Sequence, residues 1–224
     1  MNEALLNLIA ANTAFVGMHF AMSHPLRADM VKVLGAAGFQ IVYVLVSFAT
    51  FGWVYLAFKA APAGGLPGSG EIGWVIATLL TLPAMVLLAG SLMGNPALPT
   101  PMAETQARAE PKGVFRVTRH PMMWGIGLWA ISHIVLHYSL RTTITALAMG
   151  ILALVGAKLQ DRKKQALMGD AWTQWESRTG YWPQLVGFAK VGAFPWAAGL
   201  ILFVFFTWLH MPLGGIPAGI WRWF

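Results

Sequence analysis

The sequence predicts an all-α fold, a polytopic integral membrane helical bundle of about six transmembrane helices with one amphipathic helix at the membrane interface. Two observations lead to this fold class. Hydrophobic residues make up 57% of the 224 residues and charged residues only 10%, whereas an ordinary soluble domain carries about 25% charged residues. The apolar residues also gather in six stretches, each close to the roughly 20 residues that cross a bilayer core. We expect one membrane domain over residues 1–224.

The six stretches mark the expected membrane spans. They run over residues 4–22, 39–58, 72–93, 121–139, 142–158 and 193–210. The first is not expected to be a cleavable signal peptide, because Glu3 replaces the positive segment and no small-residue cleavage site follows. APAGGLPGSG at residues 61–70 is typical of a turn-rich loop.

Two polar or aromatic flanks are expected at the membrane surface. The segment DRKKQALMGDAWTQWESR, residues 161–178, places Leu167, Ala171, Trp172 and Trp175 along one helical side and charges along much of the rest. Such a pattern is typical of a helix that lies in the interface. The terminal IWRWF is typical of an aromatic belt at the headgroup level.

The basic residues indicate which side of the membrane each connection occupies. Twelve of the fifteen Lys and Arg residues fall on one side. They are Arg27, Lys32, Arg108, Lys112, Arg116, Arg119, Lys158, Arg162, Lys163, Lys164, Arg178 and Lys190, against Lys59, Arg141 and Arg222 on the other. The positive-inside rule therefore predicts both termini on the outer side. It also explains the net charge of +7 without nucleic acid.

Polar side chains form stripes inside three of the spans. The first span carries Asn12, His19 and Ser23; the second carries Gln40, Tyr43, Ser47 and Thr50; the fourth carries His133 and His137. Because lipid cannot satisfy such groups, we expect the stripes to face one another around an interior site. Helix-to-helix hydrogen bonding alone is the competing explanation for the Ser, Thr and Asn residues.

The histidines point more strongly to chemistry. All six, His19, His24, His120, His133, His137 and His210, fall within or at the end of a span. Ionisable groups inside a membrane are candidates for function, and neutral imidazoles on facing helices suit a metal or haem iron. The chain has no cysteine, which excludes disulfides and thiolate ligands.

Four motifs resemble the NnrU family, which includes bacterial proteins linked to denitrification and the plastid 15-cis-zeta-carotene isomerase. They are GMHFAMSHPLR near the N-terminus, GNP at 94–96, FRVTRHPMMWGIGLWAISH at 115–133 and DRKKQALMGDAWTQWESRTGYWP at 161–183. The resemblance runs from the first span to about residue 185 and implies a protein of a bacterial inner membrane.

The resemblance implies a bundle that binds haem b. In the isomerase branch two histidines hold the iron and the cis-trans isomerisation of an apolar carotenoid is redox-dependent. The matching positions here are His19 and His133, with His24 as a substitute for His19. Arg119, His120 and Pro121 match the recurring turn into the fourth span. Arg116 and Arg119 are expected to pair with haem propionates or with lipid phosphate.

Depth in the membrane keeps other ligand pairs open. At about 1.5 Å per residue, His19 lies about 20 Å from the outer boundary and His133 about 18 Å from the inner one. Their depths then differ by roughly 8 Å in a core about 30 Å thick. By depth, His133 or His137 would pair with His210, and His24 with His120.

Two other functions compete with a haem-dependent isomerase. RHP followed by a charged aromatic segment also resembles the isoprenylcysteine and phospholipid methyltransferases, which bind S-adenosylmethionine. The acidic pair of those enzymes is replaced here by Asp161 and Arg162, and Met123 stands where they carry an aromatic residue. A non-enzymatic factor of nitrogen-oxide metabolism is the third hypothesis.

Overall fold

The computed structural model describes residues 2–224 and is 77% helical, with no strand among those residues. This confirms the all-α fold class. The elements are α1 (Glu3–Ser23), α2 (Arg27–Ala60), α3 (Gly70–Gly90), α4 (Ala103–Arg108), η1 (Gly113–Arg116), α5 (Pro121–Leu136), α6 (Leu140–Met168), α7 (Asp170–Arg178), η2 (Leu185–Lys190), α8 (Ala193–Gly214) and η3 (Gly219–Arg222), where η marks a short 3-10 helix.

Helices cover all six predicted spans. Five of them, α1, α2, α3, α6 and α8, are long and apolar enough to cross a membrane. The sixth, α5, has 16 residues, which at 1.5 Å per residue gives about 24 Å against a core of about 30 Å. It ends at Leu136, before the predicted residue 139, because His137 takes a left-handed φ of 46°. Ser139 then caps α6 by accepting a hydrogen bond from the Thr142 amide.

Two helices are longer than the apolar stretches that predicted them. α2 begins at Arg27, well before the predicted span, and is kinked at Gly35, where φ is 71°. α6 continues past the predicted residue 158 to Met168 and carries the basic run 162–164 along its last turns. The helical hydrogen-bond pattern therefore extends beyond the apolar core at one end of the bundle.

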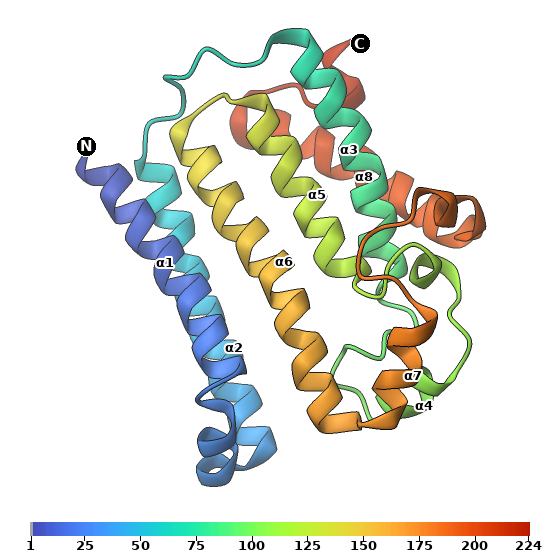
Figure 1. Cartoon of the computed structure of the whole chain (residues 1–224). Helices are drawn as coiled ribbons and strands as arrows, with labels where there is room; N and C mark the ends of the chain where they lie inside the picture. Colours follow the sequence, from blue (N-terminus) through green and yellow to red (C-terminus); the bar gives the residue numbers. More distant parts are fainter. Residues whose placement is uncertain (1) are drawn as a thin grey trace.

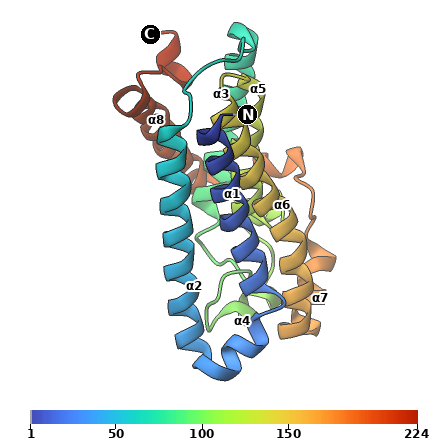
Figure 2. The same cartoon turned by 90° about the vertical axis from the view of Figure 1, so that its left-hand side faces the viewer.

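The long helices stand in a row. Neighbour contacts give the order α2, α1, α6, α5, α3 and α8. In Figure 1 the row runs from α1 on the left, with α2 largely behind it, through α6 and α5 to α3 and α8. Figure 2 shows the α1 and α2 end of this row in front. α6 therefore separates α1 from α5, and both chain termini lie at the same end of the bundle (Figures 1 and 2).

Glycines set the closest helix contacts. A Cβ at Gly125 of α5 would lie 2.8 Å from the carbonyl oxygen of Ala84 in α3, and one at Gly199 of α8 would lie 2.6 Å from Val86 Cα. Such small residues let membrane helices approach closely, where van der Waals packing holds them together. α3 is thereby clamped between α5 and α8.

The connections at one end build a separate body, which we name the end lobe: residues 91–120 and 169–190. It holds α4, η1, α7 and η2 and lies below α3 and α5 in Figure 1. Its core joins the bundle at Val86 and Leu87 of α3, against which Phe115, Trp172 and Trp175 pack.

The predicted interfacial helix over 161–178 is divided in the structure. Gly169, with φ 50° and ψ −123°, ends α6 and starts α7 in a new direction. Trp172 and Trp175 are buried at 0% and 2% exposure in the end lobe rather than placed in the headgroup layer. The amphipathic pattern was a correct sign of a helix, but its apolar side meets protein because the lobe supplies a core.

The two groups of basic residues lie at opposite ends of the bundle. The end lobe and the adjoining ends of α2 and α6 carry the larger group. At the other end, Arg141 donates to the carbonyl oxygens of Phe58 and Ala61, and Arg222 pairs with Glu71. The separation fits the charge pattern of a membrane protein; which end faces the cytoplasm stays a prediction.

Candidate functional site

The turn Arg119-His120-Pro121 connects the end lobe to α5. Pro121 occupies the first helical position, where the missing N–H costs nothing. The Arg119 amide donates to the Gly180 carbonyl at 2.8 Å, and the Thr118 hydroxyl donates to the Tyr181 carbonyl at 2.7 Å. The turn is therefore fixed to the chain that leaves α7.

Arg119 is the centre of a buried ion network. Its Nε lies 3.0 Å from Asp161 Oδ1 and its Nη2 lies 2.7 Å from Asp161 Oδ2, a two-point contact from the turn to α6. Nη2 also lies 3.1 Å from Glu176 Oε1, and Nη1 donates to the Thr179 carbonyl at 3.2 Å. Two-point contacts of this kind fix geometry as well as charge.

His120 completes the network. Its Nε2 donates to Asp161 Oδ1 at 2.7 Å, and its side chain is 0% exposed. Its Nδ1 is buried and has no hydrogen-bond partner within residues 2–224. A buried nitrogen without a partner costs about 1–3 kcal/mol, so Nδ1 is available to a small molecule that reaches it.

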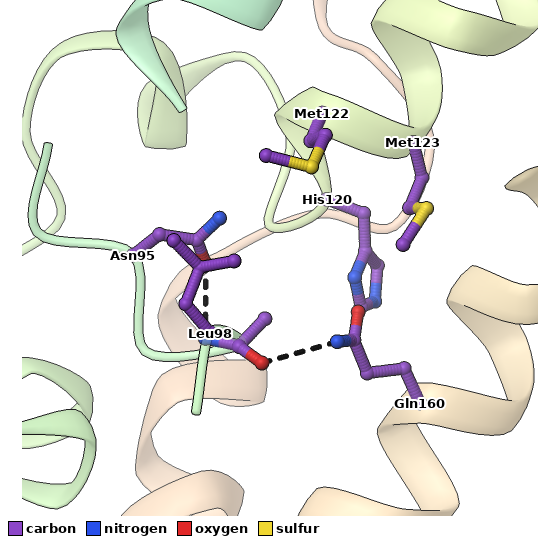
Figure 3. A pocket seen from close by; sticks show the side chains of 7 residues that line it. Asn95, Leu98, His120, Met122, Met123 and Gln160 are labelled. Atoms are coloured by element: carbon purple, nitrogen blue, oxygen red, sulfur yellow. Dashed lines mark hydrogen bonds between the residues drawn. The ribbon is translucent and has the colours of Figure 1, made fainter. Parts of the chain in front are cut away.

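A small cavity lies beside His120. It has a volume of about 20 Å³ and is lined by Asn95, Ala97, Leu98, His120, Met122, Met123 and Gln160. Figure 3 shows the loop at Asn95 and Leu98 facing the imidazole from the left and Met122 and Met123 of α5 standing above it. This volume accommodates about one water molecule, so the cavity excludes an organic substrate.

The GNP loop is held in place by α6. Gln160 Nε2 donates to the Ala97 carbonyl at 3.1 Å, and Lys164 Nζ donates to the Pro96 carbonyl at 2.9 Å. Asn95 Oδ1 accepts from the Ala97 amide. The three sequence motifs GNP, RHP and DRKKQ therefore meet at one point.

Tyr181 lies against the same network. Its hydroxyl donates to the Leu154 carbonyl at 2.7 Å, and the Arg119 guanidinium lies 5.7 Å from its ring centre. Burial, followed by the negative charge of Asp161, raises the pKa of the Tyr181 hydroxyl above its ordinary value. The hydroxyl is therefore neutral and a donor at physiological pH.

The structure brings His133 to His210. Their ring centres lie 6.1 Å apart, one on α5 and the other on α8. His133 Nδ1 donates to the Trp129 carbonyl at 2.9 Å and His210 Nδ1 to the Phe206 carbonyl at 2.7 Å. Because a carbonyl only accepts, both imidazoles carry their proton on Nδ1 and keep the Nε2 lone pair.

His19 lies elsewhere in the bundle. Its Nδ1 donates to the Phe15 carbonyl at 2.7 Å and its Nε2 lies 3.3 Å from Ser47 Oγ of α2. Ser23 and Tyr43 meet beside it, so the polar stripes of the first two spans face each other as expected. The fourth span does not join them, because α6 lies between α1 and α5.

The remaining histidines occupy the ends of helices. His24 ends α1, where burial and then the charge of Lys163 lower its pKa. His137 is exposed at the end of α5. Within residues 2–224 no group of three or more His, Cys, Asp or Glu side chains is arranged to hold a metal, so the structure offers histidine pairs rather than a larger ligand set.

The two arginines expected at haem propionates differ in the structure. Arg119 is 8% exposed and directs its donors at Asp161, Glu176 and a carbonyl, so it is occupied within the protein. Arg116 is exposed on the end lobe, where Nε donates to the Pro111 carbonyl at 3.4 Å. In the structure both arginines precede the first residue of α5, whereas His133 lies near the last residue of that helix, so neither arginine lies beside His133 and His210.

Sequence reasoning missed the acidic partners of the turn. The sequence marks Asp161 only as a departure from the methyltransferase pattern and Glu176 only as one of the charges of the expected interfacial helix. A signal was present: Asp161 is an acidic residue at the end of an apolar span, directly before three basic residues. An acid in that position needs a buried cation, and Arg119 supplies it.

These features define a class of protein: an all-α bundle with helices fit to span a membrane, closed at one end by a lobe with a buried Arg-Asp-His network. A family model described as NnrU protein matches residues 7–218. The chain belongs to the NnrU family. No curated protein and no solved structure matches it.

Proposed function

We propose that this chain is a haem-b-binding membrane protein in which His133 and His210 hold the iron. One observation carries the proposal: the two imidazoles face each other from α5 and α8 with ring centres 6.1 Å apart. This pair takes the place of the pair His19 and His133 expected from the family resemblance, because α6 lies between α1, which carries His19, and α5, which carries His133. His24 and His137 are at helix ends and have no such partner among the described contacts.

The donor set of this pair fits a haem iron. The backbone carbonyls of Trp129 and Phe206 hold both Nδ1 protons, so each Nε2 presents a lone pair. A hydrogen bond on the far nitrogen is the usual way in which a protein orients a metal-binding imidazole. Bound haem would supply one-electron chemistry at this position.

Trp129 fixes the orientation of His133. The two rings lie 4.4 Å apart, centre to centre, on the same face of α5. The ring of His133 therefore cannot turn freely, and rigid ligands favour a defined coordination. This contact also explains physically the spacing of four residues in the motif W-x-x-x-H.

The redox-dependent cis-trans isomerisation of a polyene is the activity that we propose for the haem protein. Support comes from the position of His210 on a helix with exposed apolar neighbours, Phe206 at 41% and Trp208 at 43%. An apolar substrate dissolved in the bilayer would reach this surface without crossing water.

One observation weighs against an S-adenosylmethionine-dependent methyltransferase. The carboxylates near the RHP turn, Asp161 and Glu176, are paired with Arg119 and His120 inside the protein. Within residues 2–224, both acids that contact the turn are therefore already paired and are not free to bind the charged groups of that cofactor. We therefore rank it below haem.

Optical spectra of the detergent-purified protein, expressed with haem supplied, test the proposal. We expect a sharp Soret band with resolved α and β bands on reduction in the wild type, and loss of both in His133→Ala and His210→Ala. His120→Ala, whose imidazole binds Asp161, serves as the matched control and should keep haem. Full haem content in His133→Ala would overturn the proposal. Haem loss in both His19→Ala and His133→Ala, with full haem content in His210→Ala, would instead support His19 and His133 as the ligand pair.

A further inference from the structure

We propose that a hollow on the end lobe binds the phosphate headgroup of an anionic phospholipid. The hollow has a volume of about 590 Å³, within the range of small-molecule sites. Its charged lining is Arg116, Arg178 and Lys190 with one acid, Glu110. The balance of charge therefore favours an anion.

Two of the three basic side chains are left for a ligand. Arg178 is occupied, because it donates to the carbonyls of Ala107, Arg108 and Gln174 and lies 3.3 Å from Glu110. That contact also offsets the charge of Glu110. Arg116 and Lys190 then supply the attraction for an incoming phosphate.

Their surroundings leave these two cations unneutralised. Arg116 donates from Nε to the Pro111 carbonyl at 3.4 Å, and its other nitrogens make no ion pair within residues 2–224. Lys190 makes no ion pair in the same described part of the chain. An arginine suits a phosphate because its planar fork can donate to two oxygens at once.

The hollow lies beside the starts of two apolar helices, α5 and α8. Arg116 ends η1 shortly before α5 begins at Pro121, and Lys190 ends η2 shortly before α8 begins at Ala193. Where two membrane helices start, the flanking residues stand at the boundary between hydrocarbon and water. A lipid phosphate is therefore present at this level whenever the protein is in a bilayer.

An apolar edge of the hollow points to a lipid rather than to a soluble anion. Val186 lines it and is 78% exposed; Leu185 is 81% exposed and Trp182 71% exposed. Exposed Leu, Val and Trp beside Lys and Arg are typical of surfaces that sit in the membrane interface. A soluble phosphate gains nothing from these side chains, whereas a phospholipid can bury them against its acyl chains.

Lipid retention by the detergent-purified full chain tests the site. Native mass spectrometry would compare phosphatidylglycerol, phosphatidylcholine and soluble glycerol phosphate. We expect phosphatidylglycerol to be retained best, and Arg116→Gln and Lys190→Gln each to weaken its retention about fivefold, the effect of one cation at an anionic surface. Lys112→Gln, an exposed lysine outside the hollow, is the matched control and should change little.

Three results would overturn the inference. Equal retention by the double variant Arg116→Gln/Lys190→Gln and the wild type would show that the lipid binds elsewhere. Equal retention of phosphatidylcholine would remove the anionic preference. Displacement of the lipid by glycerol phosphate would assign the hollow to a free phosphate. Circular dichroism of each variant confirms that the exposed substitutions leave the fold unchanged.

Discussion

Asp161 is the single residue that joins both side chains of the RHP turn to α6. Its carboxylate receives Arg119 and His120 at 2.7 Å each, across 42 and 41 positions of sequence. No local pattern contains this pairing, because it depends on how α6 is placed against α5. The sequence motif therefore indicates the RHP turn, but it does not indicate that Asp161 is the acidic partner of that turn.

Replacement of Asp161 should destabilise the protein strongly. Asp161→Asn leaves the buried guanidinium of Arg119 with the half-buried Glu176 as its only carboxylate, and breaking a buried pair costs about 3 kcal/mol or more. We expect a lower midpoint of thermal unfolding for the detergent-solubilised variant, measured by circular dichroism. Arg162→Gln, an exposed neighbour, is the control, and equal midpoints for both variants would contradict the structural role of the network.

Three histidines share one local geometry. His19, His133 and His210 each donate from Nδ1 to the carbonyl four residues earlier. Helix geometry brings that carbonyl within reach of each imidazole, and the side-chain rotamer seen in the structure makes the bond. The group that lies beside each imidazole, Ser47 for His19 and a second histidine for His133 and His210, could not be predicted, because it depends on the neighbouring helix.

At the scale of helices, the apolar stretches of the sequence predict where each membrane helix lies better than they predict its first and last residues. Each of the six apolar stretches corresponds to a helix. Hydropathy does not predict the polar ends of α2 and α6, because a helix continues into water wherever its backbone hydrogen bonds are satisfied. α5 was shorter than expected because His137 breaks it. The division at Gly169 reflects the lobe core, which draws Trp172 and Trp175 inward.

Close packing of α3 and α5 should depend on Gly125. In Gly125→Ala the added Cβ would lie 2.8 Å from the Ala84 carbonyl, so the helices must separate, at a cost of about 1–3 kcal/mol for an overpacked contact. We expect a lower thermal midpoint. Gly52→Ala on α2, where nothing lies within 4 Å of the new Cβ, is the control, and its thermal midpoint should equal or exceed that of the wild type. An equal fall in the midpoint of both variants would contradict the role of the Gly125 contact.

At the scale of the whole molecule, the row of helices decides which histidines meet. α6 stands between α1 and α5, whereas α3 holds α5 and α8 close together. The sequence left five histidine pairs open because depth along a helix says nothing about which helices are neighbours. The same arrangement places both termini at one end and the basic lobe at the other (Figure 1).

The absence of cysteine allows a direct test of the membrane orientation. Lys59→Cys and Lys112→Cys introduce single thiols at exposed positions on opposite ends of the molecule. If the basic lobe faces the cytoplasm, a membrane-impermeant maleimide should label Lys59→Cys in intact spheroplasts and Lys112→Cys only after permeabilisation. The reverse pattern would place the lobe outside and contradict the positive-inside prediction.

The sequence by itself determined the class of fold, the family and the approximate spans. Each of these follows from local properties: hydropathy, helical spacing and short motifs. Only the tertiary structure decided that Asp161 neutralises the RHP turn, that Trp172 and Trp175 fill a lobe, and that His133 faces His210. The physical reason is that lipid solvates every apolar helix face alike, so close packing and buried polar partners choose the neighbours.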